Sequence, residues 1–147
     1  MSKTSPTKRT LDALRKLGYD AAVVEQWIPR VRRRRDLFGF ADIIAIRPGE
    51  VLAVQACSGG GNSKRGSDHG THRAKILAHD PERKVQIYDR LRNWLEAGAK
   101  FEIWSWRKKD GRWNHKRERI GPDGVPARPL PVQVGFELTT NEEACNA

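Results

Sequence analysis

The stretch that decides the fold is "DLFGFADIIAIRPGEVLAVQAC", residues 36–57. It holds two apolar runs, each long enough for a buried strand, joined by Pro48 and Gly49. Proline at the second position and glycine at the third position of a four-residue turn favour a type II turn. The two runs are therefore predicted to form an antiparallel hairpin. Each run carries a polar residue at its outer end, Asp42 on the first and Gln55 on the second.

The register of this hairpin decides how the two polar residues lie. If Pro48 and Gly49 are the loop residues, Asp42 lies opposite Gln55, with β-carbons about 5 Å apart on one face of the sheet. A type II turn is not the usual turn of a two-residue hairpin, and a slip of one residue puts the two side chains on opposite faces. An acid among apolar neighbours is costly without a partner, so a functional role for Asp42 is favoured over a structural one.

The segments before and after the hairpin predict helices and one more strand. Leucines at helical spacing predict a helix over residues 7–17, and "AAVVEQWI" at 21–28 predicts a strand that contains Glu25. The Gly/Ser-rich residues 58–71 have the composition of a mobile loop, and "HRAKIL" after them predicts a short helix. A longer helix is predicted from Pro81, with Asp80 as its cap and an apolar stripe along it.

A second hairpin is predicted near the end of the domain. "KFEIWSW" at 100–106 reads as a strand, and the Asp-Gly pair at 110–111 favours a tight turn into "WNHKRERI". This pairing sets Trp104 opposite Arg117, Trp106 opposite His115 and Lys108 opposite Trp113. The tryptophans are then either core residues or platforms on which unpaired bases stack. Residues 1–128 are predicted to form one domain, and residues 129–147 an extended, partly disordered tail.

Charge is the most informative part of the composition. The 147 residues carry a net charge of +10, and no lysine or arginine follows Arg128. Such a domain attracts a polyanion, and nucleic acid is the expected one; a ribosome-like or merely soluble basic protein is the alternative. No apolar run is long enough to cross a bilayer and no secretory segment begins the chain, so a cytoplasmic protein without a membrane partner is expected. The two cysteines lack CxxC spacing and are expected to be reduced.

The order of helix, three strands, helix and strand, with "VVEQW", "RRDLFGFADIIAI", "VLAVQAC" and "RAKI", resembles the PD-(D/E)xK nuclease superfamily over about residues 8–106. Within it, the chain resembles small phage-borne proteins of the Holliday-junction-resolvase-like and VRR-NUC-like branches. The resemblance implies an α/β, restriction-endonuclease-like fold: a mixed central sheet flanked by helices, with an added β-ribbon. It also implies a metal-dependent DNA endonuclease that works in the cytoplasm of a bacterial or phage-infected cell. Branched or junction DNA, duplex DNA and single-stranded DNA all stay open as its substrate, and a homodimer is the assembly that resolvase-like relatives often form.

The resemblance also implies a site. In the family an acid begins the second strand, and the third strand ends in an acid, any residue and a lysine. Here Asp42 takes the first place, while Gln55, Ala56 and Cys57 take the second, so an acid and the lysine are replaced. Hard cations such as Mg²⁺ or Mn²⁺ take oxygen ligands. The expected metal ligands are Glu25, Asp36, Asp42 and the Ala56 carbonyl, and the expected catalytic residues are Asp42, Gln55 and Lys75.

The role expected of Lys75 is to assist the attacking water in place of the missing lysine. Phosphate contacts are expected from basic residues near the site, with help from one tryptophan; the DNA-binding candidates are Arg32, Arg33, Arg34, Arg35, Lys64, Arg65, Arg73, Trp106 and Lys108.

Other interpretations of single residues stay open. Asp36 is equally well a turn residue or a partner of the arginines, and Glu25 a solvent-facing strand residue. Cys57 is favoured as a small buried thiol, and a zinc half-site of Cys57 with His69 and His72 is the minor alternative to a solvated loop. Two other functions remain for the whole chain: a catalytically inactive nucleic-acid-binding module of the same fold, and a basic RNA-binding or assembly protein.

Overall fold

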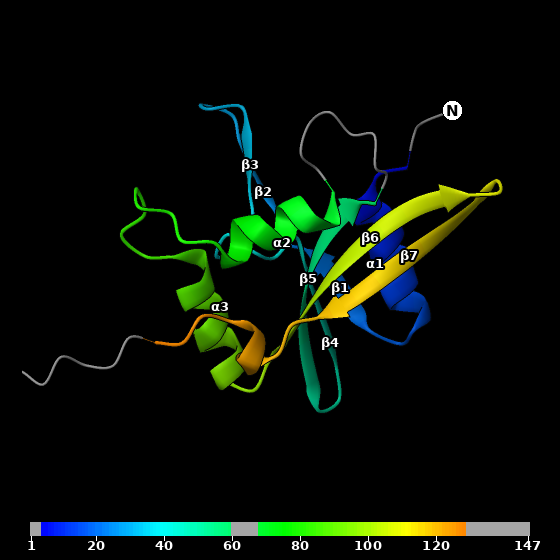
Figure 1. The fold of residues 1–147 in the computed structure, drawn as a ribbon. Coiled ribbons are helices and arrows are strands. Elements are labelled where there is room, and N and C mark those ends of the chain that lie inside the picture. The colour runs from blue at the N-terminus through cyan, green and yellow to red at the C-terminus, as the bar shows by residue number, and fades with distance from the viewer. Residues whose placement is uncertain (1–3, 60–67, 129–147) are drawn as a thin grey trace, which may run out of the picture.

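The predicted hairpin forms the centre of a mixed sheet in the computed structural model, which describes residues 4–59 and 68–128 (Figure 1). Strands β4 (Ile43–Arg47) and β5 (Glu50–Ser58) pair antiparallel with Arg47 opposite Glu50. Gly49 between them has a φ of +77°, which suits the third position of a type II turn. The predicted register is therefore confirmed, and Asp42 and Gln55 lie on the same face.

The sheet has five strands in the order β1-β4-β5-β6-β7. The outer members are β1 (Asp20–Val23), β6 (Lys100–Lys109) and β7 (Arg112–Arg119). Only β5 and β6 run parallel, and the crossover between them carries two helices. The second predicted hairpin is also confirmed, since Trp104 pairs with Arg117 and both turn residues, Asp110 and Gly111, have positive φ.

Helices cover both faces of the sheet. Helix α1 (Pro6–Lys16), capped by Ser5, buries Leu11 and Leu14 against one face. Helices α2 (His69–Leu77) and α3 (Ile87–Glu96) bury Ile76, Ile87, Leu91 and Leu95 against the other face. A short 3-10 helix, η1 (Pro122–Gly124), follows β7. No helix among residues 4–59 and 68–128 has the length and apolar character to cross a bilayer.

Side chains alternate between the two faces along β6. Phe101 and Ile103 join the core under α2 and α3, whereas Trp104 and Trp106 join the core under α1. Trp106 is only 8% exposed, and its indole N–H donates to the Thr10 hydroxyl at 2.8 Å. The tryptophans at 104 and 106 are thus core residues, which was one of the two roles open to them.

The single strand predicted over residues 21–28 is wrong. The chain leaves the sheet after Val23, and Gln26–Ile28 forms a separate strand β2, which pairs with β3 (Arg33–Arg35) in a two-stranded ribbon. The reason is the late start of β4 at Ile43: beyond the bond from the Val24 N–H to the Asp42 carbonyl, β1 has no strand to pair with. Glu25 therefore lies in the break between β1 and β2, where it belongs to neither strand.

The predicted helix from Pro81 is also wrong at its start, because α3 begins at Ile87 with Gln86 as its cap residue. The Gln86 side chain accepts from the Asp80 N–H at 2.8 Å and donates to the carbonyls of Asp80 and Arg83. These bonds stabilise a turn over residues 80–86 in place of a first helical turn.

The predicted loop over residues 58–71 is shorter in the structure, because Ser58 ends β5 and His69–Thr71 belong to α2. Residues 60–67 of that loop and the predicted tail 129–147 lie outside the described residues.

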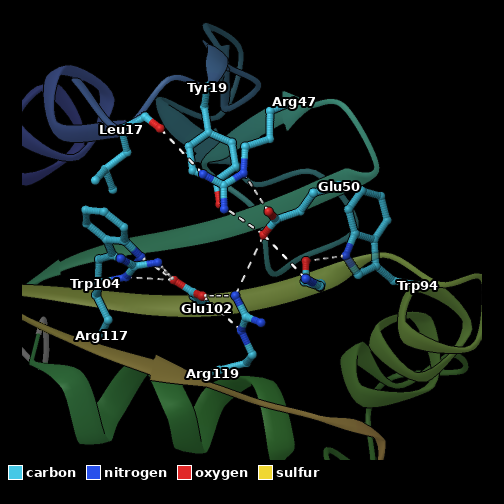
Figure 2. A network of polar contacts seen from close by, with 10 residues as sticks. Leu17, Tyr19, Arg47, Glu50, Trp94, Glu102, Trp104, Arg117 and Arg119 are labelled. Carbon is cyan, nitrogen blue, oxygen red and sulfur yellow. Dashed lines mark hydrogen bonds and ion pairs between the residues drawn. The ribbon is translucent and has the colours of Figure 1, made fainter. Parts of the chain in front are cut away.

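A partly buried ion network stabilises the junction of the central hairpin with β6 and β7 (Figure 2). Glu102 is 3% exposed and accepts hydrogen bonds from Arg117, Arg119 and the indole N–H of Trp104. Arg119 also lies 3.7 Å from Glu50, which accepts from the Tyr19 hydroxyl at 2.9 Å. Burial raises the pKa of Glu102, but the hydrogen bonds from the arginines and Trp104 outweigh it and lower the pKa overall. This network is structural, since its charges are paired with one another.

Candidate functional site

Asp42 is fixed by contacts with both neighbouring strands. It directly precedes β4 and is 3% exposed. Its Oδ2 accepts from the Gln55 side-chain amide at 2.7 Å and from the Ala56 backbone N–H at 2.9 Å. Its own backbone N–H donates to Val54 and its carbonyl accepts from Val24. The carboxylate therefore has one position, and Gln55 holds it there.

Asp36 is brought to Asp42 by a tight loop. Leu37 and Ala41 pair through two backbone hydrogen bonds of 2.9 and 3.1 Å, so the residues that flank this pair meet. Phe38 and Gly39 turn the chain inside the loop with φ values of +55° and +84°. The loop thus makes Asp36 a neighbour of Asp42, and Phe40 is fully buried in the core below.

The carboxylates of Glu25, Asp36 and Asp42 form an acid cluster in which one oxygen of each lies within 4.8 Å of the others. Two of the three acids also meet a cation. Glu25 accepts from Arg34 at 2.9 Å, and Lys75 Nζ lies 3.6 Å from Asp36 Oδ2. The structure therefore brings together five residues predicted for the site: the three acids, Gln55 and Lys75.

The pKa of Asp42 shows the electrostatic cost of this cluster. Burial, the hydrogen bond with Asp36 and the charges of Asp36 and Glu25 raise the pKa to about 9 from an ordinary 3.8, against the lowering effect of the Ala56 N–H. At this pKa the carboxyl keeps its proton at neutral pH, first because burial disfavours its ionised form and second because an ionised Asp42 would be repelled by Asp36 and Glu25. A divalent cation among them would relieve that repulsion.

The donor set fits a hard cation. All three side chains offer carboxylate oxygens, the ligands that Mg²⁺ and Mn²⁺ prefer. The contact found for Ala56 is its N–H to Asp42, so the ligand role expected of its carbonyl stays a prediction. Within residues 4–59 and 68–128 this is the one group of three acidic, histidine or cysteine side chains with such spacing.

The cysteine and histidine candidates do not form a second centre. Cys57 is buried, and burial together with the charges of Asp42 and Asp68 raises the pKa of its thiol to about 12, so it is a neutral core group. His69 Nδ1 lies 3.0 Å from the Ser105 hydroxyl and its Nε2 lies 3.4 Å from Glu118. The zinc half-site is therefore not formed by the described residues, and the buried-thiol interpretation of Cys57 is confirmed.

A groove of about 400 Å³ opens beside the acid cluster. Its walls are the β2–β3 ribbon, the loop after β3, helix α2 and the segment that leads into α3, which Figure 1 shows around one end of the molecule. Asp36 and Lys75 line the groove and also belong to the site. The other charged residues along it are all cationic: Arg33, Arg34, Arg35, Arg83 and Arg90.

The predicted DNA-binding residues fall into separate places. Arg33, Arg34 and Arg35 line the groove, but Arg32 lies in the turn before β3 and does not line it. Arg73 instead pairs with Glu118 at 3.1 Å, and Lys108 lies on the exposed end of β6. Trp106 is buried, so its predicted role as a stacking platform is wrong. Lys64 and Arg65 lie outside the described residues.

Sequence reasoning missed the apolar residues of the groove, Phe38 among them, and two of its arginines, Arg83 and Arg90. Arg83 and Arg90 come from the segment whose helix start was predicted too early, so their direction was not predictable. For Phe38 the Gly39 that follows was a usable signal of a turn, because glycine supplies the positive φ that tight turns need. The sequence suggested only a zinc role for His72. In the structure, burial and the charge of Lys75 lower the pKa of its imidazole, and the nearby Asp36 raises it by less, so the pKa is lowered overall.

The fold and the site define a basic, mixed α/β domain with a partly buried acid cluster at the edge of a cationic groove. No family model, curated protein or solved structure matches this chain. Its function is therefore inferred from the geometry of the cluster and the groove.

Proposed function

We propose that this protein is a metal-dependent endonuclease that hydrolyses phosphodiester bonds in DNA. The observation that carries the proposal is that the acid cluster borders the cationic groove: Asp36 belongs to both, and Lys75, whose Nζ lies 3.6 Å from Asp36, also lines the groove. A phosphate held by the arginines of the groove is thereby brought to carboxylates that suit a divalent cation. Anion binding beside a cation site is what phosphodiester hydrolysis requires.

Each residue of the site has a definite role in this proposal. Asp42, Glu25 and Asp36 would hold Mg²⁺ or Mn²⁺, and the bound cation would lower the pKa of a water and neutralise charge on the phosphate. Gln55 holds Asp42 through the 2.7 Å bond from its amide. Lys75, whose Nζ lies 3.6 Å from Asp36, would orient the water as an ammonium donor, or would accept the water's proton after losing its own proton to solvent.

The chain order supports a restriction-endonuclease-like fold as part of the proposal. Without the ribbon and α2, the elements run α1, β1, β4, β5, α3 and β6, which is the helix, three strands, helix and strand order of the PD-(D/E)xK superfamily. The parallel pairing of β5 with β6 and the position of Asp42 at the start of β4 agree with it. The same proposal includes two further features: the enzyme acts on branched or junction DNA, and two copies of the chain form a dimer.

Two departures favour a second candidate, a nucleic-acid-binding module without catalysis. Gln55 stands where the family has an acid, so the site has one fewer carboxylate. Cys57 stands where the family has a lysine, and its neutral, buried thiol has no charge to offer. Whether Asp36 and Lys75 replace the two missing groups is what separates the two candidates.

The deciding experiment is a cleavage assay on labelled linear, flapped and four-way DNA with Mg²⁺, Mn²⁺ or a chelator. We expect metal-dependent cleavage that Asp42→Ala abolishes while DNA binding stays largely intact, because the arginines carry the affinity. Asp20→Ala, which removes an exposed acid from β1, is the matched control and should cleave normally. Retained cleavage by Asp42→Ala contradicts the proposed site, and binding without cleavage in either metal favours the inactive module.

A further inference from the structure

The groove beside the acid cluster combines cationic and apolar side chains. Besides its arginines and Lys75, it is lined by Ile28, Val31, Phe38, Val85 and Ile87. Three of these, Val31, Phe38 and Val85, are exposed. The sugar-phosphate backbone of a duplex needs only cations. An aromatic ring among cations is instead the chemistry that binds an unpaired base together with its phosphate.

Phe38 is held at the surface by a strained backbone. Its φ of +55° lies in the left-handed region, which is unusual for a bulky side chain. The ring is 46% exposed, and its centroid lies 6.1 Å from that of Phe40 and 6.0 Å from the guanidinium carbon of Arg90. The tight loop that sets Asp36 against Asp42 thus also places an aromatic ring at the groove.

The cations of the groove differ in how they are paired. Arg34 meets Glu25, Arg83 meets Asp80 and Lys75 meets Asp36. Within the described part of the chain no carboxylate lies within salt-bridge distance of the remaining three, Arg33, Arg35 and Arg90, although all of them line the groove. Their charge is available to a bound anion.

We propose that this groove binds an unpaired nucleotide of a DNA strand, with the base against Phe38 and the phosphates on Arg33, Arg35 and Arg90. A volume of about 400 Å³ is within the range of sites that hold a small ligand. Binding of an unpaired nucleotide does not depend on the proposed nuclease activity. One consequence does rest on it: the preferred substrate for cleavage carries a single-stranded branch or end. The next phosphate of that strand then lies toward Asp36 and Lys75.

The test is a binding measurement in chelator, where no cleavage occurs. The probe is a single-stranded DNA 12-mer with 2-aminopurine at one position, compared with its duplex, with RNA of the same sequence and with polyglutamate as competitor. We expect quenching of the probe on binding, because stacking quenches this base. Phe38→Asn should abolish the quenching and weaken single-strand binding about tenfold, while duplex binding changes less than twofold.

The variants are chosen so that misfolding does not imitate the result. Asparagine is well tolerated at positive φ, so Phe38→Asn should fold at least as stably as the native chain, which thermal unfolding checks. Phe38→Tyr keeps a ring and should restore quenching. Trp113→Ala, which removes an exposed ring from β7, and the pair Arg15→Ala with Lys16→Ala, on the last turn of α1, are controls that should change little.

Four results overturn the inference. Phe38→Asn loses single-strand and duplex binding equally, or the 2-aminopurine quenching survives Phe38→Asn. RNA binds more tightly than DNA of the same sequence, or polyglutamate competes with the probe as well as unlabelled single-stranded DNA does. Selective single-strand binding without cleavage in metal leaves the inference standing and contradicts the nuclease. Cleavage without single-strand preference supports the nuclease and contradicts the inference.

Discussion

Gln55 donates a hydrogen bond of 2.7 Å from its side-chain amide to Oδ2 of Asp42, across the two central antiparallel strands. Glutamine here provides a donor, where an acid would provide a further negative charge. The bond therefore stabilises a carboxyl that already has two acidic neighbours. Glutamine in place of an acid at position 55 also leaves the cluster with less negative charge to bind a cation.

Gln55→Glu tests that exchange. The added carboxylate should lower the melting temperature in chelator, because it increases repulsion in the cluster, and raise Mn²⁺ affinity about tenfold through one more charged oxygen. Melting curves in chelator and over a Mn²⁺ series measure both effects. An unchanged Mn²⁺ midpoint contradicts a cation site at Asp42.

Asp42→Asn should stabilise the metal-free protein at neutral and alkaline pH. The pKa of Asp42 is raised to about 9, so the folded state binds a proton that the unfolded state releases above its ordinary pKa of 3.8. The stability contributed by the acid therefore falls as pH rises from about 4 to about 9. Asparagine does not titrate, so the advantage of the variant should grow over that window. Chemical denaturation at a series of pH values in chelator measures it, and a gap that narrows with rising pH contradicts the assignment.

Lys75→Ala should reduce the cleavage rate about a hundredfold, within the usual contribution of a proton-transfer group, with little effect on DNA affinity. Lys75→Arg keeps the pairing with Asp36 and should recover only part of the rate, because arginine does not give up its proton. Lys16→Ala, an exposed lysine of α1, is the control. Cleavage by Lys75→Ala at the native rate removes Lys75 from the site.

Arg33→Ala combined with Arg35→Ala should make DNA binding less dependent on salt. Each lost phosphate contact lowers the slope of log affinity against log salt by about one, so the double variant should lose about two. Arg15→Ala with Lys16→Ala removes the same charge from the opposite face and should leave the slope nearly unchanged. Equal slopes for both double variants contradict the groove as the DNA surface.

Glu102→Gln should destabilise the fold by about 2 kcal/mol at pH 7, because it leaves Arg117 and Arg119 without their buried anion (Figure 2). The pKa of Glu102 is lowered below its ordinary 4.5, so its contribution is present above that pH and is lost as pH falls through the folded value. The difference between variant and native protein should shrink in acid. Glu96→Gln, an exposed acid paired with Arg128, is the control and should cost little.

The hairpins were predictable from sequence because their turns carry strong local signals. Pro48 with Gly49 and Asp110 with Gly111 set the two registers, and the first register placed Gln55 beside Asp42. The position of Glu25 was not predictable, since nothing local marks the residue at which β1 loses its partner. The groove also depends on the Gln86 side chain, whose hydrogen bonds to residues 80 and 83 stabilise a turn where the sequence pattern predicts the first turn of a helix.

The β2–β3 ribbon begins and ends at the acid cluster. Glu25 is the residue before β2 and Asp36 is the residue after β3, so both ends of the ribbon are ligands of the proposed cation. The ribbon is therefore connected to the rest of the chain at the site itself, and Figure 1 shows it projecting away from the sheet. Any movement of the ribbon on binding a strand along its arginines would displace Glu25 and Asp36 together, while Asp42 stays bonded to the sheet.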